Sequence, residues 1–110
     1  MTRPLLVYTT FPDTDTALSI GEGLVRDRLI ACMNVLPGMR SVYAWNGEIE
    51  RGEEVAVILK TVTDRKGDVH AALKDRHPYE TPVILFIEPD GADPDTLAWL
   101  LAETSAASAP

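Results

Sequence analysis

The chain has 110 residues, 45% of them hydrophobic and 25% charged, which is enough apolar material for one domain core but not for two. Its net charge of −7 and the lack of a basic cluster argue against nucleic-acid binding. A single cysteine excludes an internal disulfide framework and fits a reducing compartment. Without a long apolar run or the features of a signal peptide, we expect a cytoplasmic protein that does not contact membranes.

The amino-terminal quarter predicts a strand followed by a helix. The apolar and β-branched run at 5–10 is typical of a buried strand. Asp13 or Thr14 then caps a helix, whose apolar spacing continues to about Leu29. We expect two glycines inside this helix to allow close packing on a sheet rather than to mark a ligand: Gly21 and Gly23.

A long β-hairpin comes next. The predicted strand 32–45 is interrupted at Pro37-Gly38, because proline cannot donate to a strand ladder and so favours a bulge. Asn46-Gly47 predicts a type I′ turn into a second strand at about 48–61. Alternation along that strand puts Val55, Val57 and Leu59 on one side and Ala56, Ile58 and Lys60 on the other.

The second half predicts a helix, a strand and a last helix. The helix opens at Thr63 or Asp64 and ends before Pro78, which forces the preceding residue out of the helical region. The strand covers 83–87 and is apolar on both faces. Asp93 caps the last helix, with a proline in its first turn.

This order predicts an α+β fold of the ferredoxin-like split β-α-β type, with an antiparallel sheet and an extra C-terminal helix. Residues 1–104 form a single domain, and 105–110 are expected to be a disordered tail. Two helices cover only one face of such a sheet, yet strand 83–87 is apolar on both. The chain has no other element large enough to cover the second face, so we infer self-association.

Several segments together resemble the CutA divalent-cation-tolerance proteins, in order and over about residues 5–103. They are TFPD at 10–13, ACMNVLPG at 31–38, SVYAWNGEIE at 41–50, ILKT at 58–61, HPYETP at 77–82 and LAWL at 97–100. The resemblance implies a stable homotrimer of ferredoxin-like subunits, similar in architecture to PII signalling proteins. It also implies a role in tolerance of divalent metals, copper especially.

The resemblance implies a copper site with one cysteine and a pair of histidines. By position, the cysteine falls on Thr9 and the first histidine on Arg76, so only His77 remains as the predicted metal ligand. A lone imidazole binds copper weakly, since tight sites need two or more soft or imidazole ligands. In a trimer, a neighbouring subunit could add Glu80 or Cys32. The alternative is that His77 is a satisfied hydrogen-bonding partner at a subunit boundary.

A second hypothesis is a PII-like sensor that binds a small metabolite between subunits. The predicted cleft residues are Tyr43, Trp45, Lys60, Tyr79 and Glu80. No glycine-rich phosphate loop supports a nucleotide. A third hypothesis is a scaffold whose trimer is itself the function. No recognisable nucleophile or H-E-x-x-H motif is present, so we do not expect an enzyme.

Three further features have mainly structural interpretations. Cys32 sits in an apolar strand and predicts a buried thiol, while His70 predicts a solvated surface histidine. We expect Tyr79 to bury its ring while its hydroxyl finds a polar partner. A carboxylate-rich run predicts a solvated hairpin rather than a cation site: Glu48, Glu50, Glu53 and Glu54.

Overall fold

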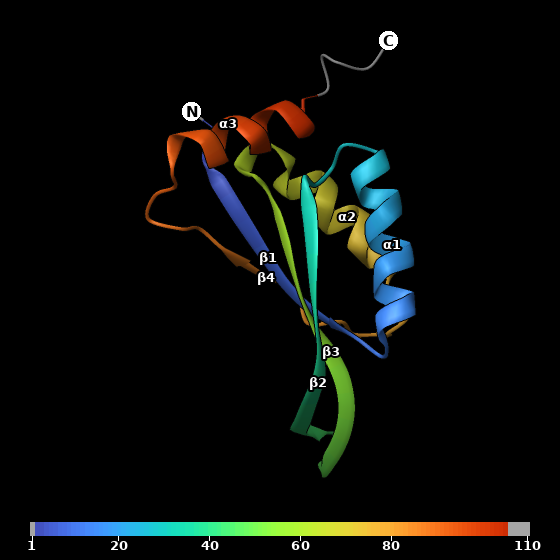
Figure 1. The fold of residues 1–110 in the computed structure, drawn as a ribbon. Helices are drawn as coiled ribbons and strands as arrows, with labels where there is room; N and C mark the ends of the chain where they lie inside the picture. Colours follow the sequence, from blue (N-terminus) through green and yellow to red (C-terminus); the bar gives the residue numbers. More distant parts are fainter. Residues whose placement is uncertain (1, 106–110) are drawn as a thin grey trace.

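The computed structural model describes residues 2–105, which form one antiparallel sheet and three α-helices (Figure 1). The sheet has the strand order β2-β3-β1-β4, as expected for a ferredoxin-like fold. The elements are β1 Pro4–Phe11, α1 Thr14–Arg26, β2 Cys32–Trp45, β3 Glu48–Val62, a 3₁₀ turn Thr63–Arg65, α2 Lys66–Arg76, β4 Leu85–Ile87 and α3 Pro94–Glu103. Within this range, no helix is long and apolar enough to cross a membrane. Of the predicted tail at 105–110, residues 106–110 lie outside the described residues.

Helix α1 begins as predicted but ends earlier than its apolar spacing suggests. Asp13 caps it, with its carboxylate accepting from the Thr16 amide at 2.8 Å. The prediction of a helix to Leu29 is wrong by three residues, because Arg28 adopts a left-handed conformation with φ of 59°. The Leu29 amide then bonds back to the Leu24 carbonyl, which closes the helix.

Close packing of α1 on the sheet depends on Gly21, as predicted for a glycine in this helix. A Cβ at position 21 would overlap the Met33 sulfur and lie 2.8 Å from Met33 Cε. Met33 is on β2, so the bare glycine backbone lets the helix approach that strand. At Gly23 the nearest atom to such a Cβ is the Arg76 guanidinium, at 3.3 Å.

The β2–β3 hairpin extends beyond the body of the molecule (Figure 1). Its two strands pair throughout, apart from a register shift between Leu36 and Met39, at the proline and glycine that predicted a bulge. Asn46 and Gly47 both have positive φ, at 50° and 81°, as a type I′ turn requires. We call residues 39–54, beyond the bulge, the arm.

Helices α1 and α2 lie on the same side of the sheet (Figure 1), and the core lies between them and the strands. Every second residue of β1 and β3 points toward these helices, and the innermost are fully buried, including Val7, Val57 and Leu59. Leu24 of α1 and Leu73 of α2 pack against these strand residues from the helix side of the core. This helix-covered face therefore buries its apolar side chains within one chain.

The opposite side of the sheet, which we call the open face, is also largely apolar. Directly paired residues share a face, so the register assigns its members: Pro4, Leu6, Tyr8, Thr10, Cys32, Asn34, Leu36, Ala56, Ile58, Lys60, Val62, Leu85 and Ile87. Leu85 is 55% exposed and Ile87 47% exposed. The sheet therefore presents apolar side chains to solvent in the single chain.

Strand β4 is shorter than predicted, covering three residues rather than 83–87. Its register pairs Leu85 with Tyr8, so a longer strand would place Val83 opposite Thr10. The Thr10 carbonyl instead accepts a hydrogen bond from His77. Val83, Leu85 and Ile87 are exposed, whereas Ile84 and Phe86 pack against the core, so this segment is apolar on both faces as predicted.

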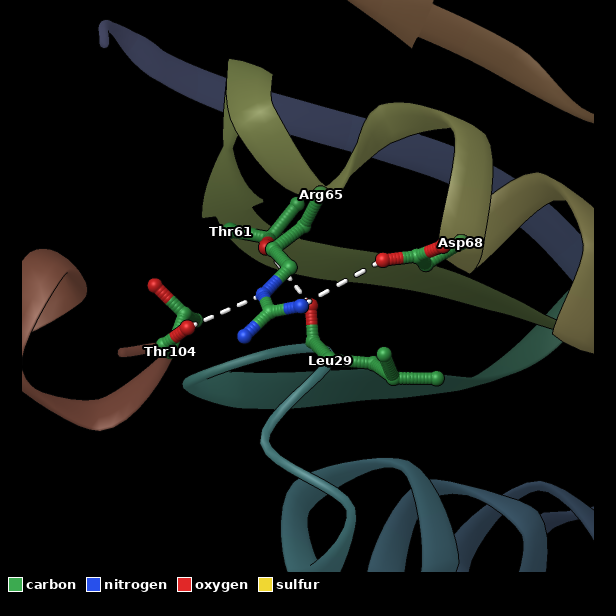
Figure 2. Close-up of polar contacts among 5 residues, drawn as sticks. All are labelled: Leu29, Thr61, Arg65, Asp68 and Thr104. Atoms are coloured by element: carbon green, nitrogen blue, oxygen red, sulfur yellow. Dashed lines mark hydrogen bonds and ion pairs between the residues drawn. The ribbon is translucent and has the colours of Figure 1, made fainter. Parts of the chain in front are cut away.

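Helix α3 lies across the end of the sheet where β1 begins (Figure 1), and arginines hold its C-terminus. Arg65 donates to the Thr104 carbonyl at 2.9 Å and pairs with Asp68 at 3.3 Å. Figure 2 shows both contacts of Arg65. Beside it, the Thr61 hydroxyl donates to the Leu29 carbonyl. Cationic groups at the C-terminus of a helix satisfy its last carbonyls and complement its dipole.

Candidate functional site

His77 ends helix α2 and is almost fully buried, with 8% exposure. Its Nε2 donates to the Thr10 carbonyl at 2.7 Å, and the Thr9 hydroxyl lies 3.3 Å from the same nitrogen. Its Nδ1 accepts from the Tyr79 amide at 3.1 Å. The ring stacks on Phe11, with centroids 4.3 Å apart. Both ring nitrogens are therefore engaged within the chain.

These contacts set the protonation state of the imidazole. Burial lowers the pKa of His77 and outweighs the Thr10 hydrogen bond and the Glu54 charge, which act the other way. The carbonyl partner requires a hydrogen on Nε2, and the amide partner requires a lone pair on Nδ1. His77 is therefore a neutral ring with a defined tautomer near neutral pH.

A second polar group lies where the arm leaves the sheet. The Tyr79 hydroxyl donates to Glu54 at 2.9 Å, which confirms the predicted polar partner, and the Ser41 hydroxyl donates to the other Glu54 oxygen at 2.7 Å. Burial alone raises the pKa of Glu54, but the hydrogen bonds from Ser41, Tyr79 and Thr10 outweigh it and lower that pKa, with a smaller contribution from His77. Burial and Glu54 together raise the pKa of Tyr79 well above its ordinary value of 10.0.

Glu54 is the functional candidate that the sequence missed. It was grouped with the solvated carboxylates of the hairpin, but it is only partly exposed and bridges the arm to the segment after α2. Its one distinguishing signal is its position directly before the buried run that starts at Val55. That signal does not identify Tyr79 as its partner, which is 25 residues away along the chain.

The positions at which the resemblance implies metal ligands do not form a copper site in this arrangement. Thr9 is next to His77, but a hydroxyl is a poor ligand for copper. Arg76 points elsewhere and pairs with Asp27 at 2.8 Å. No group of three or more metal-ligating side chains occurs among residues 2–105. A metal could bind His77 only after one of its two ring hydrogen bonds had broken, so copper binding stays a prediction.

The predicted cleft residues divide into two groups within one chain. Tyr43 and Trp45 lie on the face of the arm that also bears Glu54, the hydrogen-bond partner of Tyr79. Glu80 is exposed in the segment after Tyr79. Lys60 is at the far end of the sheet: ten residues of β3 separate it from the partner of Tyr43, roughly 30 Å. One chain alone does not bring these residues together.

Two other predicted residues differ in outcome. Cys32 is partly exposed on the open face, so the prediction of a buried thiol is wrong for the single chain. The reason is register, since Cys32 pairs with Lys60 on the side that no helix covers. His70 is exposed, as predicted, with its ring edge-on to Phe86 at 5.7 Å.

Comparison with known proteins supplies the family. The model of the CutA1 divalent ion tolerance proteins matches residues 5–103. The chain belongs to this family. It is 43% identical over 100 residues to the divalent-cation tolerance protein CutA of Pyrococcus horikoshii, which covers 91% of this chain and 97% of that protein.

Solved CutA structures have the same fold. The divalent ion tolerance protein CutA1 of Ehrlichia chaffeensis is 36% identical and superposes with a TM-score of 0.91 over 96% of this chain and 98% of that one. The periplasmic divalent cation tolerance protein CutA of Archaeoglobus fulgidus is 31% identical, with a TM-score of 0.88 over 92% of this chain and 98% of that one. The ferredoxin-like fold predicted from the sequence is thus confirmed.

Proposed function

We propose that this protein contributes to divalent-cation tolerance as a cytoplasmic, non-catalytic homotrimer. The observation that carries the tolerance role is the match to the CutA1 family over residues 5–103. The named relative from Pyrococcus horikoshii supports it, because the alignment spans nearly the full length of both proteins.

Self-association is supported by the open face. Leu36, Leu85 and Ile87 are each about half exposed there, and a largely apolar sheet face of this kind is typical of an interaction surface. Burial of apolar area contributes about 25 cal/mol per Å². In a closed ring of three copies, the two neighbouring copies would bury this face.

The tolerance role is tested by growth under metal stress. A bacterial strain whose own CutA relative is deleted would carry either the wild-type gene or an empty vector, across a series of copper and zinc concentrations. We expect the wild-type gene to restore growth at concentrations where the empty vector fails. Equal growth of the two strains at every concentration would contradict the tolerance role.

Copper binding at His77 is the finer proposal within this role. His77 is the one position where the resemblance implies a ligand and this chain keeps it, and Thr9, which stands where the cysteine is implied, lies beside it. Calorimetric titration of copper into metal-free wild type, His77→Ala and His70→Ala tests it. Saturable binding that only His77→Ala removes would support the site. Equal binding by all three proteins would overturn it, since His70 is exposed and serves as the matched histidine control.

The alternative of a metabolite sensor is favoured by a cavity of about 350 Å³ beside Glu54, between the start of α1 and the bulge of β2. Asp13, Arg40 and Glu53 line it, so it offers charges of both signs. Thermal-shift screening of small charged metabolites would test this alternative. Stabilisation that Arg40→Ala abolishes would favour a sensor, whereas no stabilisation by any compound would leave the trimer itself as the functional unit.

A further inference from the structure

Lys60 is the one cation on the open face as defined above. Its neighbours across the strands are Leu6 and Cys32, neither of which carries a charge. Among residues 2–105, no hydrogen bond or ion pair involves its ammonium group. The apolar face that self-association would cover therefore contains a positive charge without a partner in its own chain.

Covering this face has a consequence for the charge. Removing an ammonium group from water costs several kcal/mol unless an acceptor replaces the lost hydration. If other copies bury the open face, one of them must supply that acceptor. Otherwise the Lys60 end of the face must remain solvated. The surface of the same chain offers candidates for the acceptor of the Lys60 ammonium group.

The arm bears carboxylates on the same face of β3 as Lys60. Side chains alternate along a strand, so Glu48 and Glu50 share a face with Ile58 and Lys60. They pair across the hairpin with Trp45 and Tyr43. We call these four residues the aromatic arm face: Tyr43, Trp45, Glu48 and Glu50.

Of the four arm carboxylates, Glu53 and Glu54 have partners within the part of the chain that the structure describes, whereas Glu48 and Glu50 do not and cannot reach Lys60 of their own chain. No ion pair or hydrogen bond involves the Glu48 or Glu50 side chain among the described residues. Ten or more residues of continuous strand separate them from Lys60, a distance of roughly 30 Å or more. One face of β3 thus has a cation at the body and two carboxylates at the tip of the arm, with Gly52, Glu54, Ala56 and Ile58 between them. Glu54 already accepts hydrogen bonds from Ser41 and Tyr79 in its own chain.

We propose that the aromatic arm face of one copy covers the Lys60 end of the open face of the next copy, where Glu48 and Glu50 accept hydrogen bonds from its ammonium group. This rests on the self-association proposed above. Because each copy offers a cationic end to one neighbour and an acidic end to another, the contact is head-to-tail and can close into a ring. Tyr43 and Trp45 add ring faces that attract a cation. The contact would unite Tyr43, Trp45 and Lys60, which lie apart in the single chain.

The test compares charge variants by sedimentation velocity over a range of protein concentrations. The variants are Lys60→Met, the double change Glu48→Gln with Glu50→Gln, and the control Glu53→Gln. Glu53 is on the same strand but on the opposite face, where it pairs with Arg40. We expect the first two to raise the dissociation constant of the assembly about tenfold or more, and the control to leave it unchanged.

A charge exchange sharpens this test. Lys60→Glu alone should prevent assembly, and adding Glu48→Lys with Glu50→Lys should restore it, because the pairs then form with reversed signs. Circular dichroism of each variant shows whether the subunit still folds. Failure of the exchanged protein to assemble, while its subunits remain folded, would count against the contact.

The outcomes separate this inference from the proposed function. If wild type assembles and Lys60→Met assembles as tightly or more tightly, the lysine has no partner and the contact is wrong. The contact is also wrong if the double glutamine variant behaves like Glu53→Gln. If wild type is a single chain at every concentration, the proposed self-association fails and the contact fails with it.

Discussion

Both faces of the sheet carry apolar side chains, but their surroundings differ. On the helix-covered face, Val57 and Leu59 are fully buried beneath α1 and α2. On the open face, Leu85 is more than half exposed, although it is as apolar as Leu59. Alternation along each strand assigns residues to faces, but the elements of the chain decide which face is covered. One chain completes the first face, and we propose that only other copies complete the second.

The sharpest test of this difference compares two leucines. Leu59→Ala should lower the free energy of unfolding by about 2–5 kcal/mol, because it leaves a cavity in the core. Leu85→Ala should change it by less than about 0.5 kcal/mol in a dilute, dissociated sample, since the side chain is already exposed. Urea unfolding of both variants measures the difference. Equal losses of unfolding free energy would contradict the claim that the two faces differ in burial.

The close approach of α1 to the helix-covered face can be tested with two glycines. Gly21→Ala should lower the free energy of unfolding by about 1–3 kcal/mol, because its methyl group would overlap Met33. Gly23→Ala should raise it by up to about 1 kcal/mol, because alanine favours helix and the flexible Arg76 side chain can move. Thermal unfolding of the two variants should therefore shift in opposite directions, and loss of stability in both would show that the approach is equally tight at Gly23.

His77 lies at the end of the sheet, where its contacts join β1 to the segment leading into β4. Its pKa is lowered in the folded state, so the unfolded chain binds the proton more readily. The stability it contributes is complete above the ordinary value of 6.5 and is lost as pH falls below it. We expect the urea midpoint of wild type to fall as the pH drops below 6.5. The midpoint of His77→Gln should fall less over the same pH range. Parallel declines would assign the pH dependence to other groups.

The sequence predicted the order of elements and the cap of α3 at Asp93, whose carboxylate accepts from the Asp95 and Thr96 amides. For α1 it left Asp13 and Thr14 as alternatives, and Asp13 is the cap. Asn46-Gly47 likewise predicted its turn, because asparagine and glycine adopt the positive φ of a type I′ turn more readily than other residues. The early end of α1 could not be read in the same way, since Arg28 adopts a conformation that arginine rarely takes.

Long-range contacts explain what the sequence missed at the site. His77 was singled out from its neighbours in the chain, but its bonds to Thr10 and Tyr79 are what engage both nitrogens. Glu54 could not be separated from the other carboxylates of the hairpin, because its partner Tyr79 comes from another element. The single chain also leaves Lys60 far from the cleft residues with which it was grouped.

The most direct test of the account is the mass of the protein in solution, measured by light scattering for wild type beside Ile58→Asp. Ile58 is in the middle of the open face, between Tyr8 and Asn34 on the neighbouring strands. We expect wild type to have the mass of three chains, and Ile58→Asp to be a folded single chain, because a buried carboxylate without a partner opposes association. A wild type that stays a single chain at every concentration, or a variant with the same mass as wild type, would contradict the account.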